Sequence, residues 1–404
     1  MRAHLCLILL ALASHACGES QRLSPEDDWF AVLSGPSLQP GDEIVLAAGT
    51  YADPRRLEIS HRGSAERPIT IRGEAAAKVK FERPDRRQNS FNLSGCQHLI
   101  LKDLEITGGD AAIRIGGRGD HPAKFITLEN LHIHHIGGVA ITANYPGERY
   151  QSLTFRHNHI HHTGGHGEAF YLGGNNKADG SVDAYIFDSI IENNYIHDLR
   201  GDAVSQGDGI ELKDGSYNNI IRDNVIHDTN YPGIIVYGSR GKAPNIIERN
   251  AIWATGDHGI QAAADAIIRN NVIYRTAGDG IHCRDHQGAV VGGLTIVHNT
   301  VIGENPIRIV APERFSGRIT VANNAFGGTP RIPSSPEITR TGNCRGTTEM
   351  FPPPGSACIG RADPTHLSDR DFNSTARGGA RDAGAYKFDP AGNPGWRISE
   401  GFKR

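Results

Sequence analysis

Short stretches in which apolar and polar residues alternate recur along most of the chain. Gly233–Tyr237 (GIIVY) and Gly280–Arg284 (GIHCR) are two of them. Successive side chains of a β-strand point to opposite faces, so every second residue of such a stretch faces inward. The inward residues form a continuous aliphatic stack, which is how a solenoid buries a core without a globular centre. They include Ile210, Leu212, Ile234, Val236, Ile260 and Ile281.

A second repeat is an Asn followed two residues later by an apolar residue. It occurs at Asn158, Asn194, Asn224, Asn250, Asn271, Asn299 and Asn324, and Leu104 and Leu131 occupy the same column in two earlier turns. The spacings of 21 to 36 residues suit coils of three short strands with variable loops. Aligned Asn side chains can hydrogen-bond along a stack and satisfy the backbone of a sharp bend. Together the repeats predict an all-β fold, a right-handed parallel β-helix (a single-stranded solenoid).

The first residues have the pattern of an export signal. Arg2 precedes a short apolar run over Leu5–Ala13, which is too short to span a bilayer. We therefore expect a secreted or periplasmic protein. Cys17 directly follows the expected cleavage site, which leaves open an outer-membrane lipoprotein attached through a lipidated Cys17.

The patterns divide the chain into four parts. In the second part, Ser24 and Pro25 are placed as the N-cap and first residue of a short helix that covers the first coil. The repeats end at Gly328, where a Pro-rich segment begins. The predicted parts are a signal peptide (1–16), an N-terminal linker and capping helix (17–35), the parallel β-helix (36–328) and an irregular C-terminal tail packing on the helix (329–404).

Composition and cysteines agree with an exported, turn-rich protein. The 404 residues include 49 Gly and 2 Met, which argues against a helical bundle. The net charge of -3 gives no reason to expect nucleic acid as a partner. Cys344 and Cys358 lie in the same tail and are placed to pair in an oxidising compartment. Cys283 occupies an inward position and is expected to be a small core residue.

Polar and aromatic residues gather at the outward positions of the middle coils. Neighbouring coils are about 4.8 Å apart, close to the length of one sugar unit, so an outward column can follow a polysaccharide subsite by subsite. A solvated sheet face with scattered polar residues is the alternative. The candidates for substrate binding are Tyr171, Gln261, Arg308, His286 and Asn144, and the candidates for catalysis are Lys213, Tyr237, Arg284 and His282.

Lys213 is the strongest candidate for a catalytic base. Its column holds Gly173 on the preceding coil and Tyr237 on the next. Partial desolvation or nearby cations lower the pKa of a lysine and let it act as a base near neutral pH. Lys213 and Tyr237, expected on the surface, can then perform β-elimination on a uronic acid, one removing the C5 proton and the other assisting departure of the O4 substituent. Arg284-Asp285-His286 is a second candidate group.

Acidic residues offer a cation site near this pair. Glu168 and Asp208 occupy the same column position on adjacent coils, and Glu211 follows closely. Oxygen-rich clusters of this type suit Ca²⁺, although Asp and Glu at strand entrances are also explained by turn chemistry. A cation, an Arg or hydrogen bonds are needed because the C5 proton is weakly acidic until the adjacent carboxylate is neutralised.

Histidines form a further column after the Asn-type turn. The column contains His134, His161, His197 and His227, with His135 and His162 beside it. Such a cluster either binds a metal or consists of stacked, hydrogen-bonded spacers.

The N-terminal coils carry a family resemblance. Leu38–Tyr51 (LQPGDEIVLAAGTY) and Gly63–Ile71 (GSAERPITI) resemble the opening coils of the chondroitinase B and alginate lyase family of β-helix polysaccharide lyases. Asp382–Tyr386 (DAGAY) resembles the ending of many secreted bacterial β-helix proteins. The resemblance implies a Lys base at Lys213, an Arg one coil later and Ca²⁺. The Arg position falls on Tyr237, and the acidic ligands correspond to Asp208 and Glu211 with a different spacing.

These observations predict a monomeric polysaccharide lyase that cleaves an acidic, uronate-containing chain such as alginate by β-elimination. A uronate C5-epimerase shares the proton removal at C5. The alternative outside the enzymes is a non-catalytic surface solenoid that binds glycans. A glycoside hydrolase needs a pair of carboxylates, and Glu211 is the one carboxylate at an outward strand position of the groove.

Overall fold

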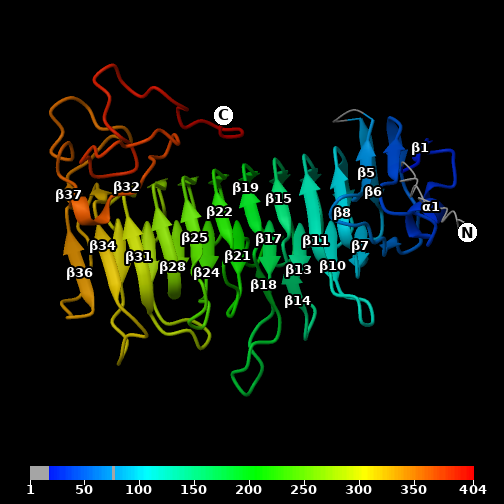
Figure 1. Cartoon of the computed structure of the whole chain (residues 1–404), viewed down its shortest axis with the longest axis horizontal. Helices are drawn as coiled ribbons and strands as arrows, with labels where there is room; N and C mark the ends of the chain where they lie inside the picture. Colours follow the sequence, from blue (N-terminus) through cyan, green and yellow to red (C-terminus); the bar gives the residue numbers. More distant parts are fainter. Residues whose placement is uncertain (1–17, 75–77) are drawn as a thin grey trace, which may run out of the picture.

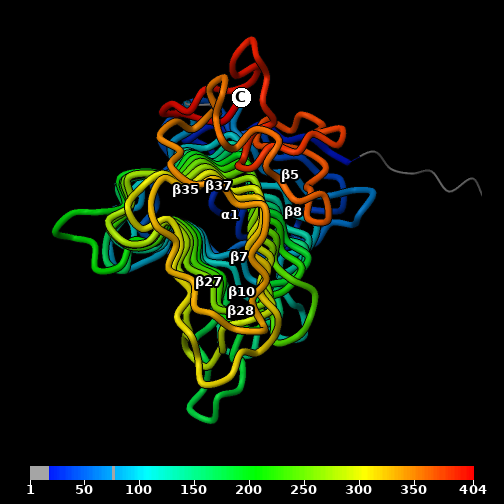
Figure 2. Tube along the Cα trace, turned by 90° about the vertical axis from the view of Figure 1, so that its left-hand side faces the viewer, coloured from blue at the N-terminus to red at the C-terminus, as the bar shows by residue number. Residues whose placement is uncertain are grey.

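The computed structural model describes residues 18–74 and 78–404, so the expected signal peptide (1–16) and Cys17 lie outside the described residues. The described chain is a right-handed parallel β-helix, as the repeats predict. Each complete coil contributes one strand to each of three parallel sheets, which form the walls of the solenoid (Figures 1 and 2). None of the helices in the described ranges is long and apolar enough to cross a membrane.

We name the three sheets A, B and C. Sheet A contains β1 (Ser20–Leu23), β2 (Glu43–Leu46), β5 (Ile69–Gly73), β8 (Gln97–Lys102), β11 (Lys124–Glu129), β15 (Thr154–Arg156), β19 (Ile190–Glu192), β22 (Ile220–Arg222), β25 (Asn245–Glu248), β28 (Ala264–Arg269), β31 (Gly292–Val297), β34 (Ile319–Ala322) and β36 (Ile338–Thr341), with β14 (Arg149–Gln151) and β18 (Tyr185–Phe187) beside them.

Sheets B and C complete each coil. Sheet B contains β3 (Gly49–Tyr51), β6 (Val79–Arg83), β9 (Glu105–Gly108), β12 (His132–His134), β16 (His159–His161), β20 (Tyr195–His197), β23 (Val225–His227), β26 (Ala251–Trp253), β29 (Val272–Tyr274), β32 (Thr300–Ile302), β35 (Ala325–Phe326) and β37 (Cys344–Arg345). Sheet C contains β4 (Glu58–Ile59), β7 (Phe91–Ser94), β10 (Ile113–Gly116), β13 (Ile141–Ala143), β17 (Phe170–Leu172), β21 (Ile210–Leu212), β24 (Ile234–Val236), β27 (Ile260–Ala262), β30 (Ile281–Cys283) and β33 (Ile307–Ile309).

The core is the predicted aliphatic stack. In sheet C, Ile210 pairs with Ile234 and Ile234 pairs with Ile260, so one inward residue lies above the next. All six residues predicted to face inward are at most 1% exposed, and Cys283 is fully buried. The predicted strand register is therefore confirmed.

The Asn residues form a continuous buried ladder. From Asn158 to Asn324, each side-chain Nδ2 donates to the Oδ1 of the Asn one coil later, at 2.9–3.0 Å. The last acceptor is Asn343, one coil beyond the predicted repeats. The residue before each ladder Asn, from His157 to Asn323, has a left-handed φ of 52–58°. The ladder therefore lies at a sharp bend that leads into sheet B, and its amides satisfy backbone groups there.

A short helix covers the first coil. Helix α1 (Trp29–Ser34) buries Trp29, Phe30 and Leu33. Its N-cap is Asp28, whose carboxylate accepts the backbone N–H of Ala31 at 3.2 Å. The prediction of Ser24 as N-cap was wrong because Ser24 bonds instead to the Asp27 carboxylate and forms a turn before the helix.

The solenoid continues past residue 328 at its C-terminal end. Strands β36 and β37 add a further partial coil, and the 3-10 helix η1 (Pro364–His366) lies in the tail after them. The tail turns back over sheet B, where Phe372 and Tyr386 join an apolar cluster with Trp253 (Figure 1). A disulfide joins Cys344 to Cys358, which confirms the predicted pairing.

The inward stack gives a test of the register. Ile234→Asp places an unpaired charge among fully buried aliphatic side chains, and we expect it to lower the free energy of unfolding by more than about 4 kcal/mol or to prevent folding. Val290→Asp, at a residue that is 38% exposed, is the matched control and should leave stability within about 0.5 kcal/mol. Denaturant unfolding followed by circular dichroism measures both, and equal stability of the two variants would contradict the register.

Candidate functional site

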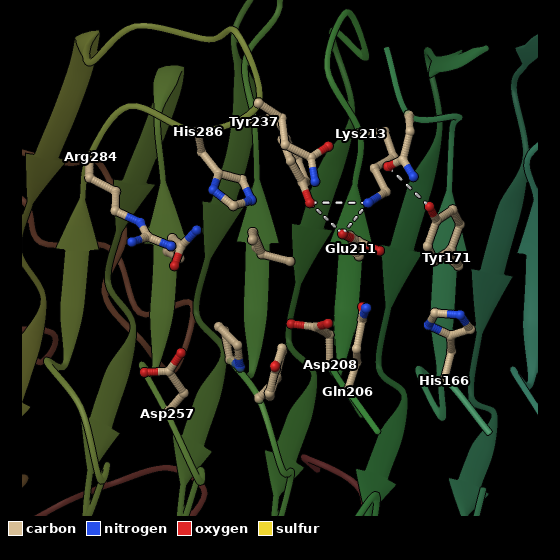
Figure 3. Close-up of a pocket in the computed structure, with 16 residues that line it drawn as sticks. His166, Tyr171, Gln206, Asp208, Glu211, Lys213, Tyr237, Asp257, Arg284 and His286 are labelled. Atoms are coloured by element: carbon tan, nitrogen blue, oxygen red, sulfur yellow. Dashed lines mark hydrogen bonds and ion pairs between the residues drawn. The ribbon is translucent and has the colours of Figure 1, made fainter. Parts of the chain in front are cut away.

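A polar pocket of about 220 Å³ lies on the outer face of sheet C (Figure 3). Its floor is formed by outward residues of β17, β21, β24 and β27, and residues before and after the strands of sheet C form its two sides. The floor residues are Tyr171, Glu211, Ile235 and Gln261; one side has Lys213, Tyr237, Arg284 and His286; the other has His166, Gln206, Asp208, Tyr231 and Asp257.

Parallel pairing explains why the floor residues meet. Tyr171 pairs with Glu211, Glu211 with Ile235, and Ile235 with Gln261. Since the residues on either side of each are inward core residues, strand alternation turns this column outward. The predicted outward column is thus the floor of the pocket.

Lys213, Glu211 and Tyr237 form a hydrogen-bonded triad in the pocket. The Lys213 Nζ lies 2.6 Å from Glu211 Oε1 and donates to the Tyr237 hydroxyl at 3.1 Å. The Tyr237 hydroxyl donates to the same Glu211 oxygen at 2.6 Å. The Lys213 ammonium also lies 4.5 Å from the centre of the Tyr171 ring. One carboxylate oxygen therefore connects the two predicted proton-transfer groups.

The triad is buried, which corrects two expectations. Lys213 is 4% exposed and Tyr237 is 3% exposed, so neither is a surface residue. Burial by itself lowers the pKa of Lys213, but the Glu211 carboxylate and the Tyr171 side chain together outweigh it, and the net pKa lies above the ordinary lysine value. The expected lowering is wrong because an anion, not a cation, is the nearest charged neighbour. Burial and the same carboxylate raise the pKa of Tyr237.

Glu211 also belongs to a cluster of three buried carboxyl groups. Glu168, Asp208 and Glu211 each offer one oxygen within 4.8 Å of the others. Both oxygens of Glu168, Oδ1 of Asp208 and Oε2 of Glu211 are buried without a hydrogen-bond partner. Buried carboxylate oxygens need a proton, a cation or water. The set therefore fits an oxygen-liganded cation such as Ca²⁺.

The proximity of these groups also changes their protonation. Burial, with repulsion from Glu211, raises the pKa of Glu168 to about 7. Burial and repulsion from Glu211 and Glu168 raise the pKa of Asp208. A cation or bound protons must therefore balance the cluster near neutral pH.

The remaining candidates divide into two groups. Arg284, His286, Tyr171 and Gln261 line the pocket, and the His286 ring centre lies 4.7 Å from that of Tyr237. His282 does not line it. Its Nδ1 is bonded to Asp279 at 2.7 Å, and its ring stacks on His258 at 3.9 Å.

Arg308 and Asn144 also lie outside the pocket. Arg308 is exposed on β33 beyond the pocket-lining strands, and Asn144 accepts a hydrogen bond from Arg114 at 3.5 Å. Arg308 continues the floor column, since Gln261 pairs with His282 and His282 with Arg308, but the pocket spans fewer coils than this column does.

Several pocket residues were missed by sequence reasoning. Four of them lie in the turns before the strands of sheet C: His166, Gln206, Tyr231 and Asp257. These turns have no alternating pattern from which the direction of a side chain could be predicted. On the other side, Asn176 donates to Asp214 and to the Gln287 carbonyl, both at 2.8 Å, and so joins two long loops beside the pocket. The polar, Gly-rich character of loop 174–186 was the available signal.

The coils, the Asn ladder and the groove define a right-handed β-helix protein. The chain belongs to the right-handed β-helix family, whose model matches residues 89–240 and 151–326. Residues 36–115 match the chondroitinase B model, which covers the coils whose sequence carried the resemblance. No curated protein matches the chain.

Solved structures share the fold at low identity. An alginate lyase from Paenibacillus sp. str. FPU-7 is 20% identical with a TM-score of 0.54, covering 81% of this chain and 99% of its own. The A-module of the Azotobacter vinelandii mannuronan C-5 epimerase AlgE4 is 14% identical with a TM-score of 0.55, covering 76% and 87%. XylC in complex with xylose is 11% identical with a TM-score of 0.62, covering 91% and 98%. These likenesses establish the fold.

The Glu168 carboxyl predicts a pH-dependent stability. The pKa of Glu168 is about 7 in the folded protein, against an ordinary value of 4.5. Protonated Glu168 therefore contributes its full stabilisation below pH 4.5, and this contribution is lost as the pH rises through about 7. The Gln side chain of Glu168→Gln does not ionise, so this variant does not lose stability as the pH rises. It should be more stable than wild type by about 3 kcal/mol at pH 8, with little difference at pH 4. Denaturant unfolding in excess chelator measures this, and parallel pH profiles for the two proteins would contradict it.

Proposed function

We propose that this protein is a polysaccharide lyase that cleaves a uronate-containing chain such as alginate by β-elimination in the sheet C pocket. The observation that carries the proposal is the Lys213–Glu211–Tyr237 triad, which connects two proton-transfer groups inside a polar groove. The Arg284 guanidinium beside the triad suits an acidic substrate. The named alginate lyase and mannuronan epimerase neighbours support the choice of substrate class.

The triad supports a complete proton cycle. Lys213 acts as the base once its ammonium has lost a proton to solvent, which a cation held by the neighbouring carboxylates would favour by offsetting the Glu211 charge and lowering the pKa of Lys213; the neutral amine then removes the C5 proton. As the C4–O4 bond breaks and the C4–C5 double bond forms, Tyr237 donates its proton to the leaving oxygen. The Lys213 ammonium, which now carries the C5 proton, passes a proton to Tyr237 over 3.1 Å, so that both residues regain the states in which the cycle began.

We propose that Ca²⁺ is held by Glu168, Asp208 and Glu211. Their four unpartnered oxygens support this ligand set. When bound, the ion neutralises the substrate carboxylate and makes the C5 proton more acidic. Glu211 can contact the triad and the ion at the same time, since its Oε1 bonds to Lys213 and its Oε2 has no hydrogen-bond partner.

The disulfide supports a location outside the cytoplasm. We propose a secreted or periplasmic enzyme because the Cys344–Cys358 bond requires an oxidising compartment to form and persist. Attachment through a lipidated Cys17 belongs to the same proposal.

Glycoside hydrolysis is a second candidate, favoured by a carboxyl that sequence reasoning had assigned to metal binding alone. Asp208 lines the pocket together with Glu211, and its raised pKa is a property of a general acid. The two reactions differ in product. A lyase forms an unsaturated sugar that absorbs in the ultraviolet, whereas a hydrolase releases reducing ends without this absorbance, and an epimerase inverts C5 without cleaving the chain.

The triad can be tested by substitution. Lys213→Ala and Tyr237→Phe should each lower kcat by about 10²–10⁴-fold, since each removes a group that transfers a proton. The assay follows unsaturated product formed from a panel of uronic polysaccharides. Lys177→Ala, at a 56% exposed side chain on a neighbouring loop, should retain activity.

Stability must be followed alongside turnover. Lys213→Ala leaves the buried Glu211 carboxylate unpaired and should lower the free energy of unfolding by about 3–5 kcal/mol. Tyr237→Phe, which preserves the ion pair, separates the catalytic effect from the loss of stability. Wild-type turnover by both variants on the best substrate would refute the assignment.

The cation proposal has its own test. Excess chelator should reduce turnover, and Ca²⁺ added back should restore it, because the substrate carboxylate is otherwise neutralised less completely. Asp208→Asn should weaken the Ca²⁺ dependence measured by titration. Unchanged turnover in chelator would assign carboxylate neutralisation to Arg284.

A further inference from the structure

A second cluster of ligand-type side chains lies on sheet B, away from the sheet C pocket. Strands β12 and β16 have the same sequence, His-Ile-His, and pair in register, so that His132 lies beside His159 and His134 beside His161. The central Ile residues are buried in the core. Because side chains alternate along a strand, all four imidazoles share one outer face.

Three of these imidazoles converge on one point. His132, His159 and His161 each offer a ring nitrogen within 4.8 Å of the other two. The Nε2 atoms of His132 and His161 are 2.9 Å apart. A tetrahedral zinc ion with Zn–N bonds of about 2.0–2.1 Å places its nitrogens roughly 3.4 Å apart. Small side-chain rotations therefore suffice to bring the three nitrogens onto one ion.

A second layer of hydrogen bonds orients these rings. His162 Nδ1 contacts His161 Nδ1 at 2.6 Å, on the side of the ring away from His132. The Nε2 of His159 contacts that of His197 at 2.8 Å, and His197 Nδ1 is bonded to the Asp198 carboxylate at 2.8 Å. Metal-binding histidines typically have such partners on their second nitrogen, which set the tautomer and the ring orientation.

The cluster is also reachable from solvent. Imidazole binds a metal ion in its neutral form, which predominates above the ordinary histidine pKa of about 6.5. The three side chains remain partly exposed, which leaves a path for an ion.

Stacking alone does not explain the histidines. The same outward column continues to Trp253 and Tyr274, whose rings stack with centres 5.6 Å apart. Other aromatic residues thus serve as spacers in this column. The paired His-Ile-His strands instead place four imidazoles side by side, each with two ring nitrogens.

We propose that His132, His159 and His161 bind a divalent transition metal ion such as Zn²⁺. Imidazole nitrogens favour zinc, copper and nickel, whereas the all-oxygen cluster on sheet C favours calcium. Three protein ligands leave a coordination position for water or another ligand. The site is independent of the proposed lyase reaction because it lies on a different wall of the solenoid.

Zinc titration of the untagged, metal-free full chain tests the site. Calorimetry should detect one site that binds Zn²⁺ with a micromolar or lower Kd. His159→Gln and His161→Gln should each weaken it by at least about 100-fold, because loss of a ligand costs more than the 10–100-fold typical of its outer partners. A Co²⁺-loaded sample should show a visible d–d spectrum that both variants lose.

Matched variants separate this site from the other clusters. Glu168→Gln in the carboxylate cluster and His282→Gln in the His258–Asp279–His282 cluster should leave the affinity for Zn²⁺ unchanged. Circular dichroism of each variant confirms that the solenoid is folded. Absence of a site tighter than about 0.1 mM, or the same affinity after His159→Gln and His161→Gln, would overturn the proposal.

Discussion

The coils of this solenoid stack only if every turn bends at the same place, and from Asn158 to Asn343 the asparagine ladder is the interaction that holds this bend. Each ladder Asn follows a residue with a left-handed φ and passes a hydrogen bond to the next coil. The bend would otherwise leave buried backbone groups unpaired, at a cost of about 1–3 kcal/mol each. With the bend held, the strands of sheet C stay in register, and the outward column becomes a continuous surface.

The site follows from that register together with burial. Glu211 and Lys213 are two residues apart on one strand end, and Tyr237 lies one coil later, so stacking brings the three groups into contact. The flanking loops then exclude water from the triad, which strengthens the attraction between Lys213 and Glu211. Burial also leaves carboxylate oxygens of Glu168 and Asp208 without hydrogen-bond partners. The burial that strengthens the triad is therefore also the reason that a cation or bound protons must balance these carboxylates.

The outer faces of the three sheets carry different features. Sheet C carries the pocket, and the C-terminal tail covers the later strands of sheet B through Phe372 and Tyr386. In sheet A, acidic and basic residues alternate from coil to coil, as in Glu192 with Arg222 and Glu248 with Arg269. Opposite charges on neighbouring coils favour the observed register over a slipped one.

The sequence by itself determined the fold class, the inward stack, the disulfide and the proximity of Lys213 to Tyr237, because each depends on periodicity or on spacing along the chain. Only the tertiary structure decided the charge state of Lys213, since the pKa depends on how close Glu211 lies and on how much water the loops exclude. It also placed His166 and Asp257 in the pocket and Arg308 outside it. The paths of the loops are set by contacts between distant segments, such as Asn176 with Gln287, and no repeat in the chain encodes those contacts.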